Sequence, residues 1–138
     1  NLGVKRIISS PTEHHCVLHT VKTEGSKGVL VEYVQVNAKG DIDVAHLETL
    51  LAAQPETKTL VSLMHANNEI GTILNIQQVG ELCAKYGALF HSDSVQTVAH
   101  YPMDVQATKP VLLRSRLPIS FSSSTSKKSD VLSMNTFI

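Results

Sequence analysis

Short β-rich runs alternate with helical stretches, and this alternation restricts the fold more than any other feature of the chain. Four runs rich in branched and aromatic residues are predicted as strands, at residues 4–9, 29–36, 59–64 and 88–93. Apolar residues recur at helical spacing within 44–53 and 76–87. Strands separated by helices at this spacing are typical of parallel strands joined by crossover helices. We therefore predict an α/β domain with a mainly parallel sheet.

The segment between the first two strands carries the signals of a helix start. Ser10 is predicted as the N-cap, Pro11 as the first helical residue, and Glu13 as the acid that completes a capping box. This helix is expected to run to about Glu24, before the glycines that precede the next strand.

Polar loops follow three of the predicted strands. They are SPTEHH at 10–15, HANNEIG at 65–71 and HSDSVQT at 91–97. Ligands of open α/β sheets bind at the carboxyl ends of the strands, and these loops share that edge. We therefore expect the functional residues of this chain to lie there.

Composition excludes several classes of function. Twelve basic and twelve acidic side chains cancel, whereas nucleic acid and anionic membranes require a cationic excess. No run approaches the roughly 20 apolar residues of a membrane span, and no targeting segment is visible. Cys16 and Cys83 form no C-x-x-C pair and are expected to be free thiols, in the cytoplasm or another reducing compartment. The chain opens on Asn1 rather than Met, and we expect it to be a fragment.

Asp93 lies where the strand at 88–93 ends, and its segment is either an ordinary turn or the edge of a site. A sheltered carboxylate stays ionised when a cation faces it, and the protonated ring nitrogen of pyridoxal phosphate is such a cation. Gln96 is then placed to contact the phenolic oxygen of the ring, and Asn68 to reach the same side. His14 is placed to stack on the ring and to move protons near neutral pH. Taken singly, each of these residues also fits a turn or a solvated surface.

Other chemistries have little support in the sequence. His15 and His19 share one helical face, but a metal site needs more ligands and no H-E-x-x-H motif is present, so we predict no metal. No glycine-rich phosphate loop or G-x-S-x-G elbow occurs either.

Three segments together resemble the cysteine desulfurases, pyridoxal-phosphate enzymes of the class V aminotransferase group. They are TEHHCVLHT at 12–20, LVSLMHANNEIGTI at 60–73 and ALFHSDSVQTVAHYPMDV at 88–105. The likeness covers residues 1–109 and implies part of the large domain of a fold-type I enzyme. It also implies the removal of sulfur from L-cysteine, giving alanine and an enzyme persulfide for iron–sulfur cluster assembly or other sulfur transfer. A sulfur-acceptor protein and a homodimer in the full-length enzyme are implied as well.

The resemblance also implies roles for single residues. His14 matches the ring-stacking histidine, which has a catalytic role, and Asn68 matches the cofactor-contacting asparagine. Asp93 matches the partner of the pyridinium nitrogen, and Gln96 matches the residue that bonds the phenolic oxygen.

Three parts of the family pattern are not found, and the first is the glycine- and threonine-containing phosphate loop that precedes this region in the family. The S-x-H-K motif that carries the Schiff-base lysine is replaced by LLRSRLPISFSSS, and neither Cys16 nor Cys83 matches the nucleophilic cysteine. Lys127 and Lys128 follow later, without the preceding histidine. We therefore expect the isolated chain to be inactive.

Residues 110–138 are predicted as a divergent, serine-rich and poorly ordered tail, because the resemblance stops abruptly at Lys109. A shifted reading frame is one hypothesis for this change. Three alternatives to the desulfurase stay open. They are a non-catalytic binding remnant of the fold, a selenocysteine lyase-like enzyme, and a weak enzyme that uses Lys127 or Lys128.

Overall fold

The fold is a parallel sheet with helices on both faces. A computed structural model describes residues 2–97 and 111–114. Within these residues a five-stranded sheet has the order β2-β1-β3-β6-β7, formed by Leu30–Tyr33, Arg6–Ser9, Thr59–Ser62, Leu89–Asp93 and Val111–Arg114. All four neighbouring pairs of strands are parallel. The helices are α1 (His15–Ser26), α2 (Val44–Ala53) and α3 (Ile76–Lys85). The predicted α/β class is confirmed.

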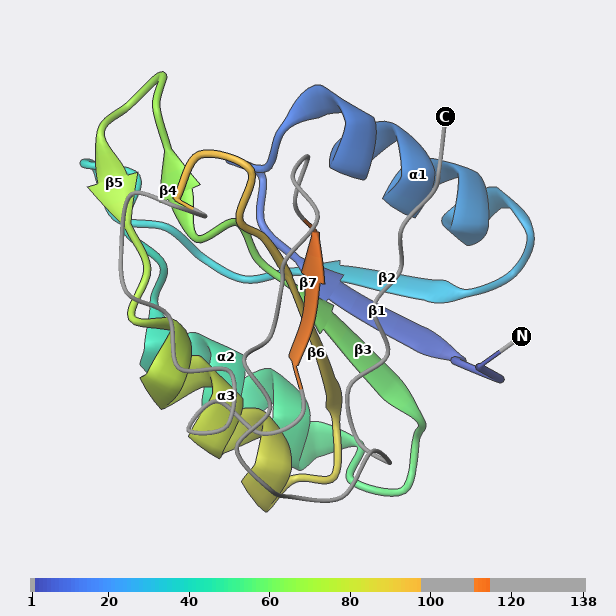
Figure 1. Cartoon of the computed structure of the whole chain (residues 1–138). Helices are drawn as coiled ribbons and strands as arrows, with labels where there is room; N and C mark the ends of the chain where they lie inside the picture. The colour runs from blue at the N-terminus through green and yellow to red at the C-terminus, as the bar shows by residue number, and fades with distance from the viewer. Residues whose placement is uncertain (1, 98–110, 115–138) are drawn as a thin grey trace, which may run out of the picture.

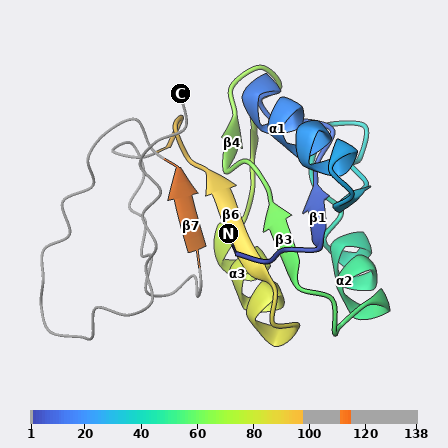
Figure 2. The ribbon, with the colours of Figure 1, turned by 90° about the vertical axis from the view of Figure 1, so that its right-hand side faces the viewer.

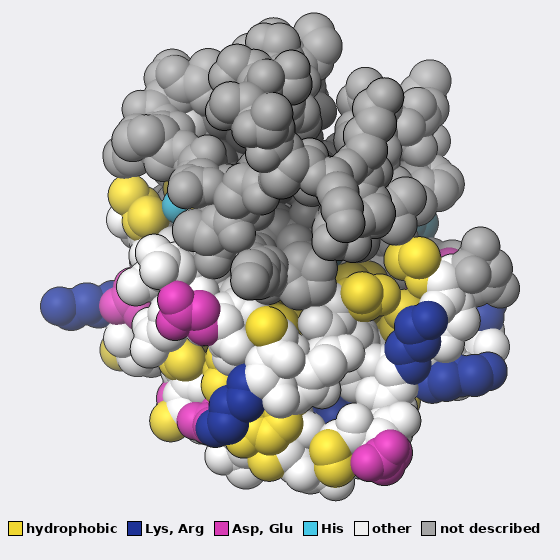
Figure 3. Space-filling view, turned by 60° about the horizontal axis from the view of Figure 1, so that its bottom comes forward, with side chains coloured by type: hydrophobic (Ala, Val, Ile, Leu, Met, Phe, Trp, Pro, Cys, Tyr) yellow, Lys and Arg dark blue, Asp and Glu magenta, His cyan; other side chains and the backbone are white. Residues whose placement is uncertain are grey.

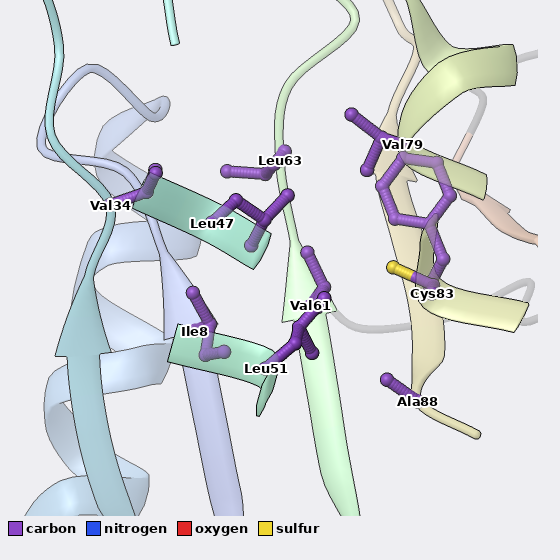
Figure 4. Close-up of a cluster of buried hydrophobic side chains, with 10 residues drawn as sticks. Ile8, Val34, Leu47, Leu51, Val61, Leu63, Val79, Cys83 and Ala88 are labelled. Carbon is purple, nitrogen blue, oxygen red and sulfur yellow. The ribbon is translucent and has the colours of Figure 1, made fainter. Parts of the chain in front are cut away.

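Helix α1 lies on one face of the sheet, and α2 and α3 lie on the other (Figure 1). Each face buries its own apolar cluster. On one face Ile7 packs with Val17 and Val21 of α1. On the other face α2 and α3 cover a larger cluster, in which Ile8 and Leu47 are fully buried (Figure 4). Successive residues of a strand point to opposite faces, and the neighbours Ile7 and Ile8 accordingly belong to different clusters. A sheet covered in this way has near-continuous apolar strands, as predicted for 59–64.

A buried arginine joins the edge strand β2 to the helical layer. Arg6 is fully buried in β1, and its Nε donates to the carboxylate of Glu32 on the neighbouring strand. Its Nη2 donates to the carbonyl oxygen of Leu50 in α2, at 2.7 Å. The ion pair and the hydrogen bond offset part of the cost of burying this charge, while Nη1 is buried without a hydrogen-bond partner among the described residues.

The start of α1 differs from the sequence prediction. The helix begins at His15 with His14 as its N-cap, not at Ser10 and Pro11. Ser10 instead closes a short turn, in which its Oγ accepts from the backbone N of Thr12 at 3.0 Å. The predicted capping box was wrong because the Glu13 carboxylate binds another loop. The predicted N-terminal residue of the helix was therefore several positions too early.

The loop predicted at 65–71 contains a small hairpin. β4 (Ala66–Asn67) pairs antiparallel with β5 (Thr72–Ile73). The hairpin rests on the predicted turn at 37–41, where a Cβ built on Gly40 would lie 2.5 Å from Ile70 Cδ1. Gly40 also has a φ of +86°, a conformation that favours glycine. This turn therefore supports the hairpin tip that carries Asn68.

Strand β7 lies inside the segment predicted as the tail. Its residues pair in register with β6, and Phe90 stands opposite Val111. Sequence periodicity missed β7 because a run of three apolar residues is too short to identify a strand. The rest of the predicted tail, with Lys127 and Lys128, lies outside the described residues. The domain boundary at residue 109 therefore stays a prediction.

Charges of both signs are interspersed on the face of the described chain shown in Figure 3. One pair on the surface joins Lys85 of α3 to Glu48 of α2, with 2.6 Å between Nζ and Oε1. Within residues 2–97 and 111–114, every helix is too short or too polar to cross a membrane. Cys83 is buried and Cys16 half-buried, and neither forms a disulfide within these ranges.

Candidate functional site

The carboxyl ends of β1, β3 and β6 meet at one edge of the sheet, where their arrowheads point the same way in Figure 2. Backbone hydrogen bonds continue beyond the strands and hold the following loops together. The N of His65 donates to the carbonyl of Asp93 at 3.0 Å, and the N of Leu63 donates to that of His91 at 3.0 Å. The three predicted polar loops therefore begin at the same edge, as parallel strands require.

Asp93 is the buried acid of this edge. It is the last residue of β6 and is 3% exposed, and its Oδ1 accepts from the backbone N of Val95 at 3.2 Å. The neighbouring Ser92 and Ser94 are fully buried. A buried carboxyl thus stands at the point where the three polar loops begin.

Glu13 is a second buried acid, which the sequence did not predict as part of the site. It is 7% exposed, and its Oε1 accepts from the backbone N of Met64, just after β3, at 2.6 Å. Burial raises the pKa of Glu13 to about 8. The hydrogen bond from Met64 opposes this rise, and the nearby charge of Asp93 adds to it. The T-E-H segment after β1 contained this acid, but its sequence pattern equally fits a helix cap.

The Asn67 side chain forms hydrogen bonds both within the hairpin and to the loop after β1. Its Nδ2 donates to the carbonyl of Thr12 at 2.7 Å, and its Oδ1 accepts from the N of Glu69 at 2.8 Å. The amide nitrogen therefore holds the hairpin against the loop after β1, and the amide oxygen closes the hairpin turn itself. Asn68, the predicted cofactor contact, is exposed at the tip.

His14 is exposed at the start of α1. Its Nδ1 accepts from the backbone N of Cys16 at 3.3 Å and lies 2.9 Å from Cys16 Sγ. Nδ1 is therefore the ring nitrogen of His14 that caps α1.

Gln96 is exposed in a turn that His65 stabilises. The N of Thr97 donates to the carbonyl of Ser94 at 3.0 Å, and Thr97 Oγ1 lies 2.7 Å from His65 Nδ1. Burial lowers the pKa of His65, which favours the neutral ring in this contact. Neither His65 nor Thr97 was predicted as a site residue, although both belong to the quoted polar loops.

The four predicted residues His14, Asn68, Asp93 and Gln96 therefore occupy the three loops of one edge, with Asp93 buried and the others exposed. A groove of about 440 Å³ lies elsewhere, along α1, and is lined by Pro11, His15, Leu18, His19, Lys22 and Tyr33. It includes none of the four. In the described ranges, no three His, Cys, Asp or Glu side chains gather as metal ligands.

A parallel sheet with a buried acid and polar loops at its carboxyl edge defines an α/β domain of the kind that binds a ligand at this edge. More narrowly, the chain belongs to the aminotransferase class V family, whose sequence pattern matches residues 3–112. Members of this family are in general pyridoxal-phosphate enzymes.

The relatives within that family are cysteine desulfurases. The chain is 45% identical over 109 residues to cysteine desulfurase IscS of Shewanella oneidensis, and equally to that of Shewanella baltica. The matched part is 79% of this chain and 26% of each relative. The chain thus spans about a quarter of the length of these proteins.

Solved structures agree with this relationship. A NifS-like protein from Rickettsia africae matches 82% of this chain and 31% of its own, with a TM-score of 0.64 and 30% identity. SspA in complex with cysteine matches 80% of this chain and 31% of its own, with a TM-score of 0.71 and 31% identity. The resemblance to the cysteine desulfurases is confirmed.

Proposed function

We propose that this chain provides the ring-binding edge of a pyridoxal-phosphate site. One observation carries the proposal: Asp93 is a buried carboxyl at the carboxyl end of a central parallel strand. A protonated pyridine nitrogen fits such an acid, because each charge offsets the burial of the other. When bound, the cofactor supplies an electron sink for chemistry at an amino acid.

The remaining predicted residues would orient the ring. Gln96 would bond the phenolic oxygen, and Asn68 would contact the cofactor from the hairpin tip. His14 would stack on the ring face and exchange a proton with the ligand. His14, Asn68 and Gln96 are exposed on three separate loops and are therefore accessible to a ligand, whereas Asp93 is buried.

The chain acts, in this proposal, as part of a cysteine desulfurase. Such an enzyme transfers the sulfur of L-cysteine to an enzyme thiol, leaving alanine and a persulfide, and a sulfur-acceptor protein then takes the sulfur for iron–sulfur clusters or other products. The identity to the Shewanella enzymes supports this reaction, and the cysteine bound to SspA is consistent with it. We expect a homodimer in the full-length enzyme and no activity from the chain alone, since S-x-H-K is absent after Asp93.

The test measures the binding of pyridoxamine 5′-phosphate to the full chain, with the fluorescence of the ligand as the signal. This probe has the ring and phosphate of the cofactor but needs no lysine for attachment. Asp93→Ala should weaken binding at least about tenfold, because the ring nitrogen loses its charged partner. Glu56→Ala, which removes an exposed acid far along the chain from Asp93, is the matched control and should bind as the unaltered chain does. Equal affinity in the Asp93 variant would overturn the assignment.

A further inference from the structure

Glu13 is buried more deeply than its place in a loop would suggest. Its Oε1 is bound to the backbone N of Met64, whereas its Oε2 is buried without a hydrogen-bond partner among the described residues. A buried carboxyl oxygen without a partner costs free energy, and such groups gather at functional sites. The proposed function gives Glu13 no role, so its burial still needs an explanation.

The position of Glu13 in the chain suggests that role. Thr12 and Glu13 each bind the segment after β3: the Thr12 carbonyl accepts from Asn67 Nδ2, and the Glu13 carboxyl accepts from the Met64 N. His14 is the next residue. The Thr12 backbone and the Glu13 side chain therefore both anchor the chain just before the predicted ring-stacking histidine.

We propose that Glu13 is a positioning residue of the cofactor site, which holds the His14 turn against the loop after β3. The inference rests on the proposed function, because it concerns the same ligand. Glu13 acts through the placement of His14 and does not itself take part in the reaction.

The charges around Glu13 agree with a neutral acid in this role. Asp93 on β6 disfavours a second negative charge, and burial acts in the same direction. Burial lowers the pKa of His65, after β3, so the neutral ring is favoured and supplies no positive charge. His14 is exposed to solvent. A neutral Glu13 adds no second negative charge beside Asp93, and its protonated oxygen is a hydrogen-bond donor.

Three substitutions separate these functions of the side chain. Glu13→Gln keeps an acceptor for the Met64 N and a donor at the other position, so affinity for pyridoxamine 5′-phosphate should stay within about threefold. Glu13→Asp keeps the acid but is one methylene too short to reach Met64, and Glu13→Leu fills the space without polar atoms. Both should weaken binding at least about tenfold.

A double-mutant cycle tests whether Glu13 acts through His14. His14→Ala removes the stacking ring, and adding Glu13→Asp to it should cost no further affinity, because nothing is left to position. If Glu13 has only a structural role, Glu13→Asp should lower the urea midpoint of unfolding, alone and in combination with His14→Ala. The affinity of the folded protein for the probe should then not change.

Several results would overturn the inference. They are full affinity in a folded Glu13→Asp or Glu13→Leu variant, a tenfold loss in folded Glu13→Gln, or additive losses in the cycle. If neither Glu13→Asp nor Glu13→Leu folds, Glu13 serves folding and the inference also fails. Failure of the proposed function has a different signature, because the unaltered chain would then not bind the probe or would bind it independently of Asp93.

Discussion

At the scale of single residues, the ionisation of Glu13 should affect folding directly. Its pKa rises from an ordinary value of 4.5 to about 8 in the folded chain, so the folded state holds its proton over this interval and the unfolded state releases it. The contribution of Glu13 to stability is therefore complete below pH 4.5 and is lost as the pH rises through 8. The loss is about 1.4 kcal/mol for each pH unit in between.

Urea unfolding of the unaltered chain and of Glu13→Gln, at a series of pH values, measures this effect. His65 has the opposite trend, because its lowered pKa makes stability rise with pH through the ordinary histidine range. The glutamine of the variant cannot ionise, and the difference between the two proteins isolates the Glu13 contribution. A difference that does not change with pH would show that the pKa of the acid is not shifted.

The site residues also show what the sequence could and could not predict. Asp93 was predictable because a single acid at the end of an apolar strand leaves few other roles. Glu13 was not, because Ser10, Pro11 and Glu13 have the spacing of a helix start. The carboxylate binds the Met64 N, a partner 51 residues away, and local pattern contains no information about that contact.

At the scale of elements, the turn at 37–41 should determine how firmly the Asn68 hairpin is held. Gly40→Ala places a Cβ 2.5 Å from Ile70 Cδ1 and also strains a φ of +86°. Gly28→Ala is the matched control, because its φ is +94° with nothing within 4 Å of the added carbon. Backbone strain alone should lower the free energy of unfolding by roughly 1–2 kcal/mol in each variant.

Any further loss of stability in Gly40→Ala, compared with Gly28→Ala, measures the effect of the clash between the added Cβ and the hairpin. Ile70 Cδ1 is the far end of an exposed side chain that can move, so we expect Gly40→Ala to lower the thermal unfolding temperature only slightly more than Gly28→Ala does. The displaced Ile70 lies two residues from Asn68, so we also expect weaker binding of pyridoxamine 5′-phosphate. Equal destabilisation would mean that the Ile70 side chain moves aside without cost.

At the scale of the whole molecule, the alternation of strand and helix was enough to predict the parallel sheet. Strand-like runs buried on both faces and helices with one apolar stripe have few other ways to pack. The order of the strands was not predictable in the same way, because β1 lies between β2 and β3 through contacts between distant residues. β7 joins the sheet beside β6, although its own sequence is too short to indicate a strand.

The last prediction concerns catalysis by the chain as a whole. With no S-x-H-K segment after Asp93, we expect pyridoxal phosphate to bind reversibly, and borohydride should leave no site-specific pyridoxyl group on Lys127 or Lys128. Hydride reduces an imine between a lysine Nζ and the cofactor aldehyde to a stable amine, and peptide mass analysis then locates it. Exposed lysines also react to some extent, so Asp93→Ala provides the reference: labelling that persists in this variant does not depend on the site. A pyridoxyl group on either lysine that disappears in Asp93→Ala, together with alanine formed from L-cysteine, would show that a lysine outside the family motif has taken over the covalent role.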